Sequence, residues 1–297
     1  MIQRRVEEMG HACHIIEVDA LAGSGELTWS ADECTIPARG GGSIDARDLD
    51  LIWWRRVQLS QKLPNENRVH VELVNNDCRA ALIGTLLTSF RGTWVNDPVH
   101  ALLAENKLLQ LNVARVAGFQ VPDTLVSQDP ERIRRFCAGR PTVLKAVMGT
   151  PRAGLLTRMV TDEDLADDAG LRVSPAIYQE YVRGSRHLRV QCFGEEMIAV
   201  LITTEELDWR AHLDSHFRVW PLAKDVTARL GEVLRALGLR MGIVDLKVTD
   251  EDKIVWLEIN QQGQFLFLEG LIGVPLTNAF SHFLLNEAGV STDVAVR

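Results

Sequence analysis

The sequence predicts an α+β or α/β fold that contains several small sheets. From residue 119 onward, short runs typical of strands alternate with helical patterns. The chain has 297 residues, which is too long for one small core and suits two or three packed subdomains. Its hydrophobic fraction of 46% and charged fraction of 24% are usual for a globular protein.

The composition argues against several classes of protein. The net charge of −8 is unlike that of a nucleic-acid binder, which usually presents a basic face. No stretch approaches the length of an apolar membrane span, and no signal-peptide pattern follows the start MIQRRVEEMG, so we expect no membrane partner. The five cysteines are scattered and form no CxxC pair, which argues against disulfides and structural zinc and fits a reducing cytoplasm.

The N-terminal part of the chain is expected to contain two strands and a long helix. The run DLDLIWWRRV (48–57) predicts a strand after a loop rich in Gly and Ser at 39–45, and TWVNDPV (93–99) predicts a short second strand. The segment 66–90 between them predicts the helix. Its apolar positions include Val71, Cys78, Leu82 and Leu86.

Asp97 and Pro98 mark the start of another helix. Asp is a favoured N-cap residue, and Pro fits the first helical position because the N–H that it lacks would have had no partner. A following helix at 107–117 is expected to end at Gly118, which is a C-cap residue type. We place a domain boundary near residue 97.

The rest of the chain predicts an alternation of elements, among which one helix has a clear pattern. The apolar side chains of the helix at 225–240 fall on one face, and Gly238 closes it. In chain order, the predicted elements are a strand at 119–127, a helix at 131–139, a strand at 141–147, a loop at 148–157, a short acidic helix at 162–169, strands at 176–182, 188–193 and 196–205, the helix at 225–240, strands at 241–248 and 253–260, and a helix at 275–286.

The last two predicted strands carry the strongest local signal for a site. Glu258 and Asn260 are two residues apart, so both side chains are expected on one face of their strand, together with Trp256; Asp245 and Lys247 share a face of the neighbouring strand. The apolar residues expected to point the other way are Val255, Leu257 and Ile259. Mg²⁺ takes oxygen ligands and typically bridges one or two carboxylates to nucleotide phosphates. The alternative is that these are exposed polar positions on half-buried strands.

Lys145 and the loop after it favour a phosphate site. Lys145 lies inside a predicted strand of Val, Leu and Ala, where an unpaired charge would be costly to bury, and a nucleotide phosphate is a reasonable partner. The loop bracketed by Gly149 and Gly154 can offer backbone N–H groups to phosphate oxygens. It matches neither a Walker loop nor a GxGxxG fingerprint. An ordinary turn is the alternative for this loop, and a solvated helix lysine is the alternative for Lys107.

The stretch YQEYVRGSRHLRV suits recognition of a nucleotide. Backbone groups along 180–182 could pair with an adenine edge, while Glu180 or its neighbours accept hydrogen bonds from ribose hydroxyls. Arg189, on the strand that follows, has a planar fork that matches phosphate oxygens. The alternative for Arg183 and Arg186 is a solvated basic loop.

Taken in order, these segments resemble the pattern of ATP-grasp enzymes over residues 97–285. The pattern consists of a helix lysine, a strand lysine before a glycine loop, a Q-E-Y-V segment, an arginine strand, and Asp followed by E-I-N. The segments WWRRV (53–57), NDPVHALLAENKLLQL (96–111) and EINQQGQFLFLE (258–269) resemble the microviridin and graspetide synthetases more specifically. Those ligases macrocyclise a ribosomal precursor peptide through side-chain esters or amides. A more distant resemblance is to ligases that add glutamate to protein or peptide ends.

The resemblance implies an ATP-grasp fold, the cofactors ATP and Mg²⁺, and a division into subdomains. These are an N-terminal pre-ATP-grasp α/β subdomain at 1–97, a central subdomain at 98–184 and a C-terminal subdomain with the metal site at 185–297. Residues implied to bind the nucleotide are Lys107, Lys145, Gly149, Gly154, Gln179, Glu180, Tyr181, Val182 and Arg189, with Lys145 and Arg189 also catalytic. Those implied to ligate Mg²⁺ are Asp245, Glu258 and Asn260. From charge alone, we expect substrate carboxylates to be attracted by Arg183, Arg186, Arg210 and Arg218.

The implied activity is that of an ATP-dependent carboxylate ligase. It would phosphorylate Asp or Glu side chains of a precursor peptide with a leader and an acidic core, and a Ser, Thr or Lys side chain would then attack. Two alternatives stay open: a glutamate or amino-acid ligase acting on a protein end or a small molecule, and a non-catalytic nucleotide- or peptide-binding module. A homodimer is a further expectation. The family begins with a strand before its first helix, whereas MIQRRVEEMG already looks like that helix, so we expect the first strand to be missing.

Overall fold

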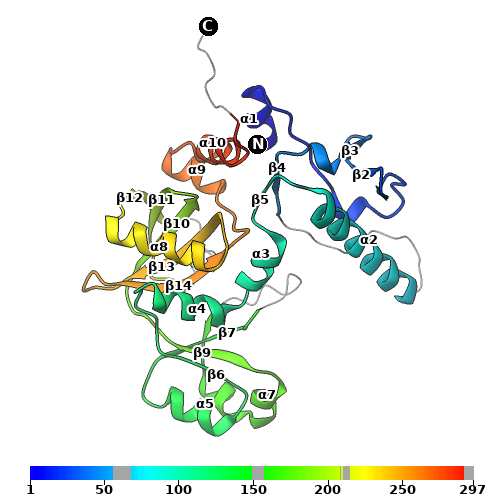
Figure 1. Cartoon of the computed structure of the whole chain (residues 1–297). Helices are drawn as coiled ribbons and strands as arrows, with labels where there is room; N and C mark the ends of the chain where they lie inside the picture. Colours follow the sequence, from blue (N-terminus) through cyan, green and yellow to red (C-terminus); the bar gives the residue numbers. More distant parts are fainter. Residues whose placement is uncertain (56–67, 149–156, 208, 210–214, 291–297) are drawn as a thin grey trace. The chain divides into compact units, whose positions relative to one another are not determined.

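The computed structural model describes residues 1–55, 68–148, 157–207, 209 and 215–290. The chain divides into two compact units, which Figure 1 shows coloured along the sequence. The terminal unit contains Met1–Asn96 and Pro275–Arg297, and the central unit contains Asp97–Val274. Within the described part of the chain, every helix is too short or too polar to cross a membrane.

In its described residues, the terminal unit combines two small sheets with three helices. An antiparallel sheet has the order β1-β2-β3, and a parallel pair joins β4 to β5. The elements are α1 (Ile2–Glu8), β1 (Thr28–Trp29), β2 (Cys34–Pro37), β3 (Ser43–Asp45), β4 (Leu51–Trp53), α2 (Arg68–Ser89), β5 (Thr93–Val95) and α10 (Leu276–Glu287), with 3₁₀ turns at Val18–Ala20 and Ala46–Asp48.

The long helix α2 packs as its sequence pattern predicts. Leu82 and Leu86 are four residues apart, so they lie on the same helix face, where both are buried against Ile36 and Ile52. The helices predicted at the start of the chain and at 275–286 are confirmed, and the one predicted at 66–90 is confirmed over Arg68–Ser89, while residues 66 and 67 lie outside the described residues. The loop predicted at 39–45 is wrong for its last residues, because Ser43–Asp45 pair with β2.

The central unit begins with two helices, α3 (Pro98–Ala104) and α4 (Lys107–Val116). The Asp97 carboxylate accepts hydrogen bonds from the backbone N–H groups of Val99 at 2.8 Å and His100 at 3.1 Å, which confirms the predicted N-cap. The prediction that α4 stops at Gly118 is also confirmed. Gly118 has a φ of +85°, which glycine adopts without steric strain.

A four-stranded antiparallel sheet with the order β6-β9-β7-β8 follows in the central unit. Its strands are β6 (Thr124–Ser127), β7 (Thr142–Lys145), β8 (Arg158–Met159) and β9 (Ala176–Glu180), and its helices are α5 (Pro130–Cys137), α6 (Asp162–Ala166) and α7 (Asp168–Val173). The single acidic helix predicted at 162–169 is wrong, because Asp167 interrupts it. The Asp167 carboxylate accepts from the N–H of Gly170 at 2.9 Å and so caps a second helix.

The second sheet of the central unit has five antiparallel strands in the order β12-β11-β10-β13-β14. Helices α4 and α8 cover one face of this sheet, as Figure 1 shows. Leu230, Val233 and Leu234 of α8 are buried there, as the pattern of that helix predicts. The strands are β10 (Arg186–Phe193), β11 (Glu196–Thr203), β12 (His216–Trp220), β13 (Met241–Val248) and β14 (Ile254–Asn260); the helices are α8 (Lys224–Ala236) and α9 (Phe267–Ile272).

A β-bulge in β14 changes which side chains face the site. Asp245 of β13 is opposite Glu258, but the next residue, Leu246, is opposite Trp256, so Leu257 is an extra residue on β14. As a result Trp256 lies in the core with Ile259, while Glu258 lies on the other face. The predicted grouping of Trp256 with Glu258 is therefore wrong, because strict alternation fails at a bulge.

Candidate functional site

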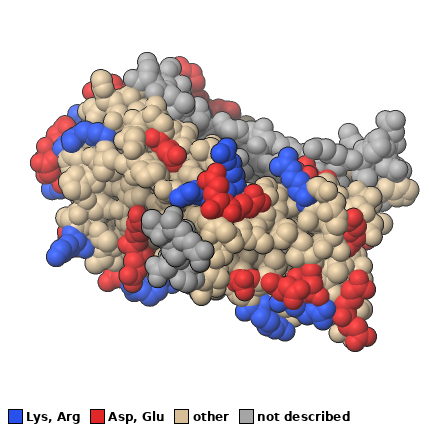
Figure 2. All heavy atoms as spheres, turned by 90° about the horizontal axis from the view of Figure 1, so that it is seen from above, with Lys and Arg blue, Asp and Glu red and all other residues tan. Residues whose placement is uncertain are grey.

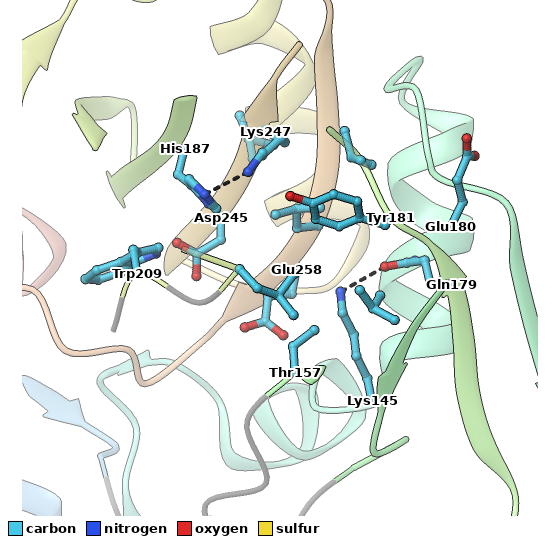
Figure 3. A pocket seen from close by; sticks show the side chains of 15 residues that line it. Lys145, Thr157, Gln179, Glu180, Tyr181, His187, Trp209, Asp245, Lys247 and Glu258 are labelled. Carbon is cyan, nitrogen blue, oxygen red and sulfur yellow. Dashed lines mark hydrogen bonds between the residues drawn. The ribbon is translucent and has the colours of Figure 1, made fainter. Parts of the chain in front are cut away.

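A pocket lies between the two sheets of the central unit. Residues of β7 and β9 form one wall, and residues of β10, β13 and β14 form the other. Lys145, Asp245 and Glu258 all line this pocket, and Figure 3 shows their side chains around it. The side chains that the sequence predicts for phosphates and metal therefore share one cleft.

Arg189 and Asp245 form a buried ion pair, of which Asp245 lines the pocket and Arg189 is not among the lining residues. They are opposite each other on β10 and β13, and Arg189 Nη1 donates to both carboxylate oxygens at 2.7 and 2.8 Å. Arg189 Nη2 donates to the carbonyl oxygen of Gln264 at 3.0 Å, and its guanidinium lies 5.2 Å from the ring centre of Trp209. These three contacts hold the planar guanidinium in one orientation.

Glu258 adds a third charged side chain beside this ion pair, on β14 next to the bulge. Its carboxylate lies 3.1 Å from the Lys107 ammonium and accepts from the Asn260 side-chain amide at 3.4 Å. The row Arg189–Asp245–Glu258 thus runs across three neighbouring strands. Its two carboxylates each have a cation beside them, which reduces the repulsion between the two negative charges.

Gln110, which was not predicted, fixes the position of β14. It is buried on α4, three residues after Lys107, and its Nε2 donates to the carbonyl oxygen of Ile259 at 3.0 Å. The Ile259 N–H in turn donates to Gln110 Oε1 at 3.0 Å. Ile259 lies between Glu258 and Asn260, so this amide holds the strand edge where the proposed metal ligands are. Gln110 lies in the segment NKLLQL, but a helical pattern does not distinguish a glutamine that bonds to a neighbouring strand from a glutamine exposed to solvent.

Lys145 is held by a neutral partner within the four-stranded sheet. Its ammonium donates to Gln179 Oε1 at 2.8 Å, which Figure 3 draws as a dashed line, and Gln179 Nε2 donates to the Thr124 hydroxyl at 2.9 Å. Gln179 is almost fully buried. This chain of bonds directs the Lys145 ammonium toward the pocket.

The segment 179–182 runs along the pocket as predicted for a nucleotide hinge. Tyr181 and Val182 line the pocket. The N–H groups of Glu180 and Tyr181 already bond to the carbonyl oxygens of Asp123 and Pro141, both at 2.9 Å, so they do not remain for an adenine edge. The Glu180 side chain is exposed and points away from the other labelled side chains in Figure 3. Because Glu180 also lines the pocket, the contact between its carboxylate and ribose stays a prediction.

A buried His187–Lys247 pair also lines the pocket and was not predicted as part of the site. Lys247 Nζ and His187 Nε2 are 2.8 Å apart. Burial lowers the pKa of Lys247 to about 8, against the opposing effects of Glu205 and Asp250. The sequence signal was present, because both residues share strand faces with Arg189 and Asp245, but isolated polar residues on strands rarely identify their partners.

The arginines predicted to attract substrate do not gather at the pocket in the described part of the chain. Arg186 pairs with Asp252 at 2.7 Å and donates to the Thr249 carbonyl oxygen, so it secures the turn between β13 and β14. Arg218 lies over the Trp220 ring at 4.9 Å. Neither these two nor Arg183 lines the pocket. On the face shown in Figure 2, lysine and arginine side chains lie next to aspartate and glutamate. The substrate role of these arginines stays a prediction.

Three predicted residues lie outside the described residues. They are Gly149, Gly154 and Arg210. The phosphate-binding role of the glycine loop therefore also stays a prediction.

The donor set fits a nucleotide-bound Mg²⁺. Among the described residues there is no group of three or more His, Cys, Asp or Glu side chains that could hold a metal by themselves. Mg²⁺ does not require one, because it takes one or two carboxylates and completes its shell with phosphate oxygens and water. Asp245 and Glu258 supply the carboxylates. Beside them, Arg189 Nε is buried and has no hydrogen-bond partner in the described structure, which leaves a donor for an anion.

The chain is similar to several solved ATP-grasp ligases. One is the macrocyclase MdnC from Microcystis aeruginosa MRC bound with its precursor peptide MdnA, with a TM-score of 0.86 and 26% identity over 96% of this chain and 94% of that chain. Another is a RiPP-associated ATP-grasp ligase from Chryseobacterium gregarium in complex with ADP and a leader and core peptide (TM-score 0.83, 20% identity, 96% and 92%). A third is the ATP-grasp ligase PsnB with a minimal precursor variant, Mg and ADP (TM-score 0.80, 22% identity, 97% and 94%). No family model and no curated protein matches the chain.

The fold and the site together define an ATP-grasp ligase. The similarity extends over nearly the whole of both chains, so it includes the terminal unit as well as the pocket. The three structures named above were solved with a precursor peptide, a precursor variant, or a leader and core peptide.

Proposed function

We propose that the protein is an ATP- and Mg²⁺-dependent ligase that forms macrocyclic ester or amide links in a ribosomal precursor peptide. One observation carries the proposal: Lys145, Asp245 and Glu258 line a single pocket, in a chain similar along its length to ligases solved with precursor peptides. The precursor would consist of a leader and an acidic core. The reaction would take place in the cytoplasm, where ATP is available and the scattered cysteines stay reduced.

The proposed reaction has two steps that balance. A carboxylate oxygen of an Asp or Glu side chain takes the terminal phosphoryl group of ATP, and ADP leaves. A Ser or Thr hydroxyl, or a Lys amine, then attacks the activated carbon, loses its proton and releases phosphate. The peptide loses one water for each link. ATP with Mg²⁺ supplies the phosphoryl group and neutralises charge on it.

The residues of the chain would position and neutralise charge, because this chemistry needs no covalent nucleophile from the enzyme. Asp245 and Glu258, with Asn260, would hold the metal. Lys107 and Lys145 would hold phosphate oxygens. Arg189 would direct its fixed fork at the transferred phosphoryl group or at the activated carboxylate.

The hinge and the subdomains complete the proposal. Tyr181 and Val182 would hold the adenine, and the glycine loop would cover the phosphates. In the proposed division, residues 98–184 and 185–297 provide the two walls of the nucleotide site, and residues 1–97 form the pre-ATP-grasp subdomain. A homodimer is part of the same proposal.

The test is a reaction with any short peptide encoded beside the gene that has a leader and a core rich in Thr or Ser and Asp or Glu. Purified protein, precursor, ATP and Mg²⁺ should give a peptide lighter by a whole number of waters, with one ADP per link, and chelation of Mg²⁺ should stop both. An unchanged peptide mass, together with ATP turnover on a free amino acid, would favour the amino-acid ligase. Nucleotide binding without turnover on either substrate would favour a non-catalytic binding module.

A further inference from the structure

Gln191 is a buried polar residue of β10 that has no role in the proposed function. It follows Arg189 by two residues, so both side chains point to the same face of the strand. Gln191 is 0% exposed and Arg189 is 5% exposed. Glutamine is mostly a surface residue, so the contacts of Gln191 must account for its burial.

The side-chain amide of Gln191 is only partly satisfied. Its Nε2 donates to the backbone carbonyl oxygen of Arg189 at 3.1 Å, and its Oε1 is buried without a hydrogen-bond partner in the described structure. Because only the nitrogen of an amide side chain can donate to a carbonyl oxygen, this bond fixes Oε1 as the open end. A buried acceptor without a donor costs free energy, so a donor for Oε1 would stabilise the site.

The surroundings of Gln191 leave one polar side chain as the partner for Oε1. The cross-strand neighbours of Gln191 are Ile198 on β11 and Ile243 on β13, and the next residue of β10 on this face is Phe193. Among these immediate neighbours on the sheet face, Arg189 alone is polar. Two residues of a strand are about 7 Å apart, a distance that an arginine and a glutamine side chain bridge together.

Arg189 has the matching open donor. Its Nε is buried without a partner among the described residues, while Nη1 bonds to Asp245 and Nη2 bonds to the carbonyl oxygen of Gln264. Asp245 is also a proposed metal ligand, so its carboxylate has to serve the metal as well as Arg189. A contact from a second residue is a common way to keep such a side chain oriented. An anion in the pocket can use the Nη hydrogens, whereas Gln191 Oε1 has no other immediate polar neighbour on the sheet face.

We propose that Gln191 is a positioning residue for Arg189. When Asp245 holds the metal, Gln191 Oε1 accepts from Arg189 Nε and keeps the two Nη groups directed at the terminal phosphoryl group. The proposal rests on the proposed function, because it requires ATP and Mg²⁺ in the pocket. Gln191 touches neither of them and acts only through Arg189.

The test measures the binding of two nucleotides that differ by the terminal phosphoryl group. Dissociation constants for ADP and for the β,γ-imido analogue of ATP are measured by calorimetry with Mg²⁺ and the full chain. Gln191→Met and Gln191→Leu remove the amide and keep a side chain of similar size. Ile243→Val is the control, because it trims the packing beside Gln191 and leaves the amide in place.

The expected effect is on the preference between the two nucleotides. The unchanged protein and Ile243→Val should bind the ATP analogue about tenfold more tightly than ADP, as expected for a hydrogen bond from a charged group to the terminal phosphoryl group. Both Gln191 variants should lose most of that preference, while their affinity for ADP stays within about twofold of the unchanged protein. In an Arg189→Lys background, Gln191→Met should have no further effect, because Gln191 acts through the guanidinium.

Each result decides a different question. No binding of either nucleotide by the unchanged protein would refute the proposed function itself. Binding of both nucleotides without a preference, or with the same preference in the Gln191 variants, would refute only the positioning role. Equal weakening of both nucleotides by Gln191→Met, or an additive loss in the Arg189→Lys background, would indicate a general structural role and would also overturn the proposal. A thermal melt of each variant separates these outcomes from unfolding.

Discussion

Replacing Glu258 with Gln should abolish product formation and leave the fold intact. The side chain keeps its size and one oxygen, so the hydrogen bond from Asn260 can persist, but the negative charge that faces Lys107 is lost. A carboxylate is a much better ligand for Mg²⁺ than an amide. The substitution therefore acts on metal and nucleotide binding more than on packing.

The structure sets the size of the two effects. At 3.1 Å, the Lys107–Glu258 attraction is about 5 kcal/mol before desolvation for an effective dielectric constant of about 20. The two side chains are 27% and 17% exposed, so solvent reduces the net contribution to stability to about 1 kcal/mol. Loss of a residue that only supports a metal ligand lowers affinity or activity by about 10- to 100-fold, so loss of a ligand charge should lower activity by at least about 100-fold.

The assay pairs Glu258→Gln with Glu251→Gln, an exposed glutamate in the turn before β14. Peptide mass and ADP release are followed with the precursor, and the thermal midpoint is measured for each variant. Glu251→Gln should behave like the unchanged protein. Full activity of Glu258→Gln would refute the assignment of Glu258 as a metal ligand, and a collapse of its melting transition would refute the claim that its role is local.

Three further outcomes follow from buried and paired groups. Gln110→Met leaves the N–H and carbonyl groups of Ile259 without their side-chain partner, so urea unfolding should show a free energy of unfolding lower by about 3 kcal/mol. The variant should also need more Mg²⁺ for activity. An unchanged Mg²⁺ requirement would contradict the positioning role of Gln110. The Arg158 guanidinium holds the pKa of Asp164 at about 2, below the 3.8 of an unpaired aspartate. The Arg158–Asp164 ion pair therefore stabilises the folded protein fully above about pH 4, and this stabilisation is lost as the pH falls toward 2. Asp164→Asn should lower the free energy of unfolding by about 1 kcal/mol at pH 7 and leave it unchanged below pH 2. Burial raises the pKa of the Cys192 thiol, so alkylation of the native protein followed by peptide mapping should leave Cys192 unlabelled while partly exposed cysteines react.

The elements with strong local signals could be predicted from the sequence. Leu230 and Gly238 define α8 because apolar spacing and a C-cap glycine are properties of one segment, and the same holds for Asp97 and Pro98 at the start of α3. Short strands such as β1 (Thr28–Trp29) and β12 (His216–Trp220) were missed because pairing with distant residues, rather than local preference, makes them strands.

The site could be predicted in its residue types but not in its contacts. The sequence placed Asp245 and Glu258 on neighbouring strands, and they are opposite each other. The ion pair from Lys107 to Glu258 joins residues far apart in the chain, and no local pattern encodes it. The sequence predicts the wrong face for Trp256, because strict alternation along a strand does not allow for the extra residue of a bulge.

The extra residue in β14 has a consequence for how this hairpin tolerates insertion and deletion. Removing Leu257 would restore regular pairing and leave Trp256 in the core and Glu258 in the pocket, since each would keep its present cross-strand neighbour. Removing Glu258 would instead bring Leu257 opposite Asp245, so the strand would pair regularly but the carboxylate would be lost from the pocket. Natural variation in the length of this strand should therefore concentrate at one position, and homologous sequences of unequal length can preserve the same chemistry there.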